Sequence, residues 1–151
     1  MKKNSPKKKP VNYKTNEQPG KAEEPDAMYR SVKIIPQVKD FTYNEFKKIA
    51  DKSPFTQAEW AAILHVSERT LQRYAKNNGV FAPINAERAV QVAQVLSRAK
   101  EVFGDMDKFY HWIKRNPPML EGELSMQSLS THDGINKVLT QLGRIEHGLF
   151  A

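Results

Sequence analysis

Four side chains in the middle of the chain have the chemistry to read nucleic acid. Arginine pairs with O6 and N7 of guanine and glutamine with adenine, so a helix face that carries both can read bases directly. The four recur at intervals of three and four residues, as one helix face requires: Arg69, Gln72, Arg73 and Lys76. At the leading end of the same stretch lie Ser67, Glu68 and Thr70. We predict that these seven residues contact DNA in the major groove.

The carboxyl-terminal end offers a second kind of surface. Leu149, Phe150 and the carboxylate of Ala151 follow a predicted helix, which places apolar side chains at an end that ordinarily frays in water. Either these side chains fold back onto the chain's own core, or they fill a partner's pocket while Arg144 and Glu146 make charged contacts at its rim. The predicted partner-binding residues are Leu142, Arg144, Ile145, Glu146, His147, Gly148, Leu149, Phe150 and Ala151.

No cluster in the sequence has the pattern of a catalytic or metal site. Cysteine is absent, and the four histidines include no pair at the i, i+4 spacing of a helical metal site. Ser128, Ser130 and Thr131 lie near His132, but they lack a nucleophile-elbow motif and oxyanion donors. We therefore predict a binding protein that is not an enzyme and that has no metal or cofactor.

The DNA-binding face needs two short helices joined by a tight bend at His65-Val66. Thr56 and Glu59 have capping-box spacing at the start of the first helix, and Ser67 can cap the second. Apolar residues at helix-turn-helix spacing would lock the pair at a steep angle. They are Trp60, Leu64, Val66, Leu71 and Tyr74, with the small Ala61 at the closest approach. The sequence predicts a helix-turn-helix over residues 56–77, although a purely structural helix pair would share this pattern.

One position departs from the usual motif. His65 stands where the turn commonly has Gly, and His is among the residues that tolerate positive φ. The second helix is expected to end near Asn77-Asn78-Gly79, because Asn and Gly suit the left-handed residue that closes a helix.

Helical periodicity continues on both sides of this motif. Thr42 and Glu45 have capping-box spacing ahead of an earlier helix. Asn85 is placed to cap a long helix that ends near Phe103, and its wide apolar surface predicts burial on more than one side.

Two further helices complete the chain. The first carries Trp112 and stops at Pro117-Pro118. The last runs from about 133 to 146, with Gly148 placed to cap its end. No strand alternation of useful length appears, so we predict an all-α fold.

Composition divides the chain further. The 151 residues carry a net charge of +7 with a pI of about 9.6, which favours binding to polyanions. Residues 1–27 hold seven Lys against four acidic residues and almost nothing apolar, so they are expected to form a disordered arm, either solubilising or adding phosphate contacts. Residues 28–98 would form the DNA-binding domain, opening with a strand or an extended lead-in, and 99–151 the partner-binding domain. No secretory signal or membrane span is evident, which predicts a cytoplasmic protein.

The chain resembles the Xre/MbcA/ParS antitoxins over roughly residues 54–151. The first block is the helix-turn-helix with Arg69-Thr70-Leu71-Gln72-Arg73, and the second leads from Ala99 through Val102-Phe103-Gly104-Asp105 to Trp112. The third contains Leu120-x-Gly122, Leu129-x-Thr131, Gly134, Val138, Leu142 and Arg144-Ile145-Glu146-x-Gly148. Two loops depart from the family pattern, at Asn116-Pro117-Pro118 and at Ser125.

This resemblance implies an antitoxin with two partners. Its C-terminal domain would cover the cognate toxin, by resemblance a RES-domain protein that consumes NAD, and block access to the toxin's active site. Its helix-turn-helix would bind operator DNA and repress its own promoter, as a homodimer that reads two half-sites. The alternative is a DNA-binding adaptor or partition-type protein that uses the same module to bind a partner other than a toxin.

Overall fold

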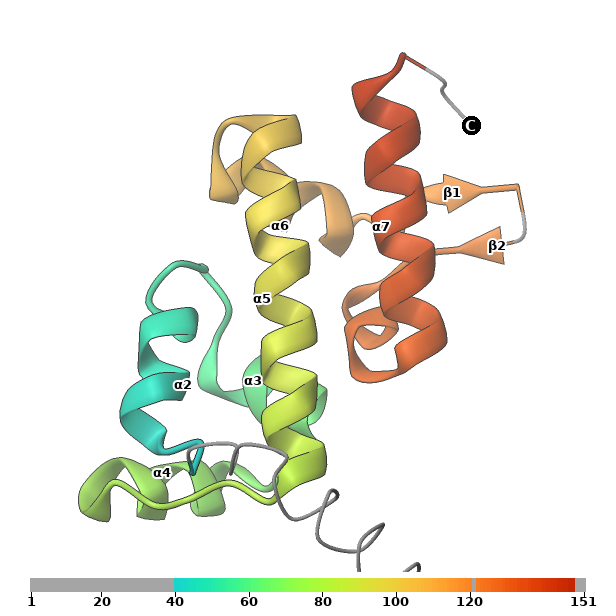
Figure 1. Ribbon diagram of the computed structural model, residues 1–151. Helices are drawn as coiled ribbons and strands as arrows, with labels where there is room; N and C mark the ends of the chain where they lie inside the picture. Colours follow the sequence, from blue (N-terminus) through green and yellow to red (C-terminus); the bar gives the residue numbers. More distant parts are fainter. Residues whose placement is uncertain (1–39, 121, 149–151) are drawn as a thin grey trace, which may run out of the picture. The chain divides into compact units, whose positions relative to one another are not determined.

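The computed structural model describes residues 40–120 and 122–148 (Figure 1). These residues fold into six α-helices, one 3-10 helix and a two-stranded hairpin. In chain order the elements are α2 (Tyr43–Ala50), α3 (Gln57–Leu64), α4 (Glu68–Asn77), α5 (Pro83–Phe103), α6 (Met106–Lys114), β1 (Pro118–Met119), β2 (Gly122–Glu123), η1 (Met126–Ser130) and α7 (His132–Glu146). The predicted helical fold is confirmed. The predicted arm and the lead-in up to residue 39 lie outside the described residues.

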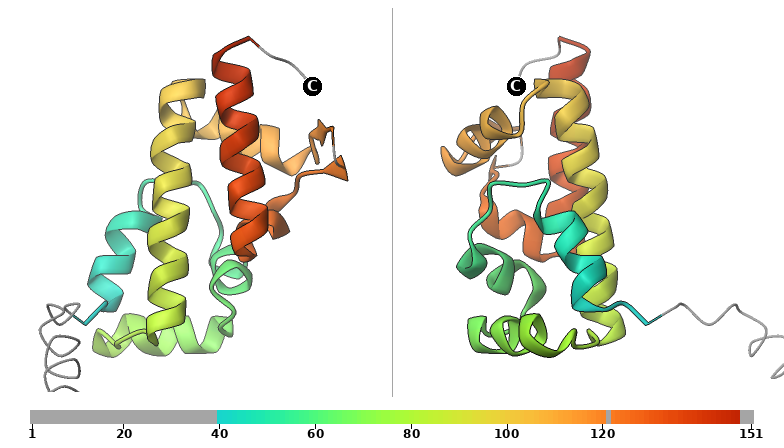
Figure 2. Two further views of the ribbon diagram at one scale, coloured as in Figure 1. Left: turned by 45° about the vertical axis from the view of Figure 1, so that its right-hand side comes forward. Right: turned by 90° about the vertical axis from the view of Figure 1, so that its left-hand side faces the viewer.

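Helix α5 is the centre of the fold. It packs against α2, α3, α6 and α7, and Figures 1 and 2 show these four helices arranged around it. Because neighbouring helices cover α5 on several sides, Val95 is fully buried, as is Val92 on the main apolar stripe. The predicted domain boundary after Arg98 falls inside α5, so both halves of the described chain share this helix and one core.

The start of α5 differs from the prediction. The helix begins at Pro83, with Ala82 at the N-cap position and no side-chain cap, so Asn85 lies in the first turn. Proline suits this first position because its fixed φ matches the helix and its missing N–H would have had no helical acceptor. The prediction that Asn85 caps this helix is therefore wrong.

A short β-hairpin was not predicted. Pro118 pairs with Glu123, and Met119 with Gly122, in antiparallel register. Ahead of the hairpin, Asn116 has a φ of 49°. A proline could not adopt this left-handed conformation, because its ring fixes φ near −65°. The order Asn116 then Pro117, a departure from the family pattern, therefore fits the backbone that turns α6 into the hairpin.

Helix α7 starts at a close contact with η1. The Thr131 hydroxyl accepts a hydrogen bond from the backbone N–H of Gly134 (3.0 Å), which caps the helix as its N-terminal turn requires. A Cβ atom on Gly134 would lie 2.1 Å from the carbonyl oxygen of Ser128, so only glycine fits here. Further along, the helix buries Val138 and Leu142 completely.

None of the described helices is both long and apolar enough to cross a membrane.

Candidate DNA- and partner-binding surfaces

The bend between α3 and α4 has the expected backbone. His65 adopts the left-handed conformation (φ 55°), and the N–H of Val66 donates to the carbonyl of Ala61 (3.0 Å). At the start of α3 the Thr56–Glu59 capping box is complete. At the start of α4 the Ser67 hydroxyl accepts a hydrogen bond from the N–H of Thr70 (3.0 Å). Histidine therefore takes the glycine position of the turn, and both helices begin at the predicted caps.

The core of this helix pair leaves one face of α4 uncovered. Leu71 is 2% exposed, and Tyr74 stacks edge-on against Phe81 with ring centroids 5.0 Å apart. The opposite side of α4 carries exposed residues, which include the predicted DNA contacts Glu68, Arg69, Gln72, Arg73 and Lys76. The guanidinium of Arg73 lies 5.6 Å from the centroid of the Tyr74 ring, and the Arg73 side chain remains exposed.

Two of the predicted DNA contacts also have a structural role. The hydroxyls of Ser67 and Thr70 are 2.8 Å apart, and Ser67 caps α4. Thr70 is only partly exposed. The four polar side chains at positions 69, 72, 73 and 76 are therefore better placed for base or phosphate contacts than these two.

The helix-turn-helix is joined to the C-terminal half by polar contacts that the sequence did not reveal. His65 Nε2 donates a hydrogen bond to the carbonyl oxygen of Ser130, at the end of η1 (2.7 Å). Glu59 Oε1 accepts from the Tyr110 hydroxyl (3.0 Å) and from Lys114 Nζ (2.9 Å), both on α6. Sequence spacing identified Glu59 as a cap but gave no sign of partners 51 and 55 residues away.

The environment of Glu59 keeps its carboxylate ionised. Burial tends to raise its pKa, but hydrogen bonds from Lys114, the Thr56 N–H and the Tyr110 hydroxyl outweigh burial and lower the pKa below 4.5. The same contacts raise the pKa of Lys114. Because the pKa of Glu59 is lower in the folded than in the unfolded chain, its stabilisation is present above the unfolded pKa and is lost as the pH falls through the folded value.

We expect Glu59→Gln to lower the free energy of unfolding by about 1–2 kcal/mol at pH 7, since the amide loses charge-assisted hydrogen bonds to α6. The matched control is Glu45→Gln, which removes only an exposed pair with Lys48 and should cost at most about 0.5 kcal/mol. Urea unfolding at several pH values measures both. The difference between wild type and Glu59→Gln should shrink as the pH falls below 4.5. A difference that stays constant down to pH 3 would contradict this account of Glu59.

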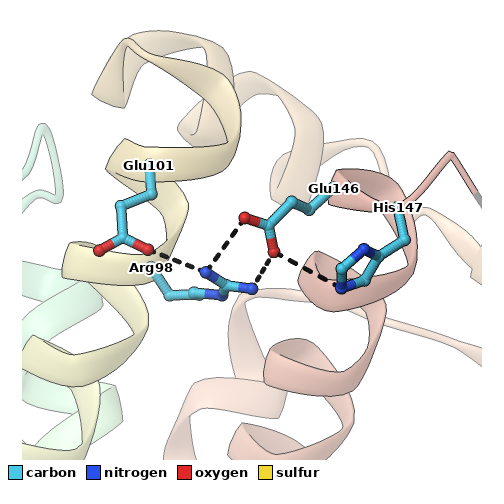
Figure 3. Close-up of polar contacts among 4 residues, drawn as sticks. All are labelled: Arg98, Glu101, Glu146 and His147. Carbon is cyan, nitrogen blue, oxygen red and sulfur yellow. Dashed lines mark hydrogen bonds and ion pairs between the residues drawn. The ribbon is translucent and has the colours of Figure 1, made fainter.

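The end of α7 is tied to α5 by an ion-pair network (Figure 3). Arg98 bonds to both Glu146 and Glu101, the latter at 2.9 Å, and His147 Nε2 lies 4.0 Å from Glu146 Oε2. Glu146, predicted to contact a partner, is therefore committed to a contact within the chain. No local signal in the sequence identified Arg98 as the partner of Glu146, because the two residues are 48 positions apart.

The other predicted partner-binding residues differ in accessibility. Leu142 is 0% exposed, so it belongs to the core and cannot contact a partner directly, a correction to the prediction. Its helical spacing with Val138 gives the physical reason. Arg144 and Ile145 are partly exposed, whereas His147 and Gly148 are exposed. Leu149, Phe150 and Ala151 lie outside the described residues.

Both halves of the described chain match antitoxin domains of known proteins. Residues 45–94 match the antitoxin Xre-like helix-turn-helix domain, and residues 98–148 match the antitoxin Xre/MbcA/ParS C-terminal toxin-binding domain. The chain is 32% identical over 104 residues to Antitoxin Xre of Photorhabdus laumondii, a match that covers 68% of this chain and 70% of that protein. It is also 32% identical over 97 residues to Antitoxin Xre of Yersinia enterocolitica, which covers 63% and 65% respectively.

A helix-turn-helix that shares one core with a toxin-binding domain defines a DNA-binding antitoxin of a toxin–antitoxin system. The chain belongs to the Xre antitoxin family. This membership confirms the resemblance drawn from the sequence, and it agrees with the prediction of a binding protein rather than an enzyme.

Proposed function

We propose that this antitoxin neutralises a RES-type, NAD-degrading toxin by direct binding through its C-terminal half, and that it represses its own promoter through α4. The match of residues 98–148 to a toxin-binding domain supports binding of a toxin by this half, and the RES type of that toxin is what the family resemblance implies. The uncovered polar face of α4 supports the second, because a helix held by Leu71 on one side and polar on the other has the form of a recognition helix.

Operator recognition rests on α4. Arg69, Gln72 and Arg73 carry base-reading groups, and Lys76 adds a phosphate-binding charge near the helix end. Ser67, Glu68 and Thr70 lie at the end of α4 that would enter the groove. The protein acts as a homodimer in this proposal, because two recognition helices then read two half-sites of one operator.

Toxin recognition involves the end of α7. His147 and Gly148 are exposed there, and Arg144 and Ile145 are partly exposed. The Arg98–Glu146 contact stabilises the last turn of this helix against α5. Leu149, Phe150 and Ala151 would then complete a surface whose apolar side chains fill the entrance to the toxin's active site.

A chain that stops after Gly148 tests this assignment. Co-expressed with the toxin encoded by the neighbouring reading frame, the shortened chain is expected to lose most of its protection of cell growth, because the apolar anchors are gone. Cutting instead after Arg115 would remove α7 and the buried Val138 and Leu142, so loss of rescue would then reflect unfolding.

The control is the same shortened chain in an operator-binding assay and a thermal melt, both of which should match the full-length chain. Equal rescue by the two chains would contradict a role for residues 149–151. Absence of any binding between the full-length chain and the toxin would instead favour the adaptor or partition-type alternative.

A further inference from the structure

The outer face of α6 carries cations and an aromatic ring in one stripe. Lys108, His111, Trp112 and Arg115 follow at i, i+3, i+4 and i+7, so their side chains share one side of the helix. The other sides of α6 are occupied, since Phe109 and Ile113 are fully buried and the Tyr110 hydroxyl bonds to Glu59. We call these four residues the α6 stripe.

The α6 stripe lines a surface hollow of about 520 Å³, and Pro117 and Pro118 complete its lining. Trp112 forms its apolar wall, and its ring is held against those of Phe103 and Phe109 at centroid distances of 5.5 and 6.0 Å. The tryptophan is only partly exposed, so its position is set by the core before any partner arrives. A rigid aromatic wall of this kind is typical of binding hot spots.

The charge of the hollow is positive. Lys108 and Arg115 are exposed, and among the described residues neither forms an ion pair with a carboxylate. No acidic side chain is among the residues that line the hollow. Two carboxylates beside α6 have partners of their own, because Asp105 caps the start of α6 and Glu59 bonds to Lys114 on another side of the helix. An anionic partner would therefore gain attraction from both cations.

From these observations we propose that the α6 stripe binds an acidic segment of the cognate toxin. This inference rests on the proposed function. The seven-residue step from Lys108 to Arg115 advances about 10 Å along the helix axis, which is about three residues of an extended chain. The fitting segment thus has two acidic residues two to four positions apart, with an apolar residue facing Trp112.

A toxin fits this surface better than DNA does. The stripe lies within residues 98–148, which match the toxin-binding domain. Helix α5 is 21 residues long, or about 30 Å, and Figures 1 and 2 show α4 at one end of it and α6 towards the other. DNA bound along α4 would therefore lie far from the α6 stripe.

The test is the double variant Lys108→Glu/Arg115→Glu, measured against the toxin encoded by the neighbouring reading frame. We expect its affinity for the purified toxin to fall at least tenfold. We also expect a lower association rate constant, which no longer decreases as salt is added. The matched control is Lys47→Glu/Lys100→Glu, which changes the net charge equally at exposed lysines outside the stripe and should stay within twofold of wild type. Thermal melts establish that both variants fold.

Each other outcome has a distinct meaning. Unchanged toxin affinity in a folded stripe variant would overturn this inference while leaving the proposed function intact. Loss of operator affinity with normal toxin binding would instead assign the surface to nucleic acid and also overturn it. Failure of the wild-type chain to bind the toxin would contradict the proposed function itself.

Discussion

Gly134→Ala is expected to destabilise the protein by about 3 kcal/mol, because the new methyl group has no room between α7 and η1. Its Cβ would meet the carbonyl oxygen of Ser128 at 2.1 Å and the carbonyl carbon at 2.7 Å. Both are backbone atoms, so relief requires α7 to move away from η1, which would disturb the buried Leu129. We expect the melting temperature to fall by roughly 10–20 °C and toxin binding to weaken with it.

Gly143→Ala provides the matched control on the same helix. Apart from its chain neighbours and the backbone of its own helix, no atom lies within 4 Å of a Cβ at this position, and its φ is not in the left-handed region. Alanine should therefore stabilise α7 by about 0.5–1 kcal/mol through its better helix propensity. We therefore predict that the change in the free energy of unfolding has opposite signs for the two variants, as measured by thermal or urea unfolding. Equal stability of the Gly134 and Gly143 variants would contradict the close packing of α7 on η1.

Arg69→Ala/Arg73→Ala is expected to weaken operator binding by at least about thirtyfold, because two base-contacting arginines together contribute about 2–6 kcal/mol per DNA-bound subunit. Each arginine that contacts a base contributes about 1–3 kcal/mol, and about 1.4 kcal/mol corresponds to tenfold in affinity. Both side chains are exposed on α4, so the fold and its melting temperature should not change. Fluorescence anisotropy with operator and with scrambled DNA of equal length, at fixed salt, measures the loss and its specificity.

The control removes two positive charges far from α4, in Lys100→Ala/Lys108→Ala. Its operator affinity should remain within a few-fold of wild type, because only long-range attraction is lost. An equal loss on operator and scrambled DNA for the arginine variant would identify phosphate contacts rather than base contacts. No loss on either DNA would exclude α4 as the recognition helix.

Local features of the fold could be predicted from the sequence because neighbouring residues determine them. The capping box of Thr56 and Glu59, the Ser67 cap and the left-handed His65 all involve residues within a few positions of one another. Burial of Leu71 and Leu142 also follows from helical spacing. The same spacing indicates that Leu142 faces the core and not a partner.

Features that depend on distant residues could not be predicted. Thr42 occupies the N-cap of α2 without a side-chain hydrogen bond, and the Asn44 N–H is satisfied instead by the side chain of Asn78, 34 residues away. Thr42 itself forms a β-bridge with Val80. The Arg98–Glu146 contact and the hydrogen bonds of Glu59 are likewise products of tertiary packing. They hold the candidate surfaces in place, and short-range spacing carries no information about them.

The continuity of α5 limits how such antitoxins can be recombined. A 21-residue helix begins beside the recognition helix and ends at the toxin-binding half, and it contributes core residues to both. A chimaera joined at residue 98, between the two matched domains, would combine the two halves of α5 from different proteins. The core-facing residues of each half would then have to pack against elements with which they did not evolve. Under the proposed function, a new operator preference would therefore arise more easily by exchange of a few exposed residues on α4 than by exchange of whole domains.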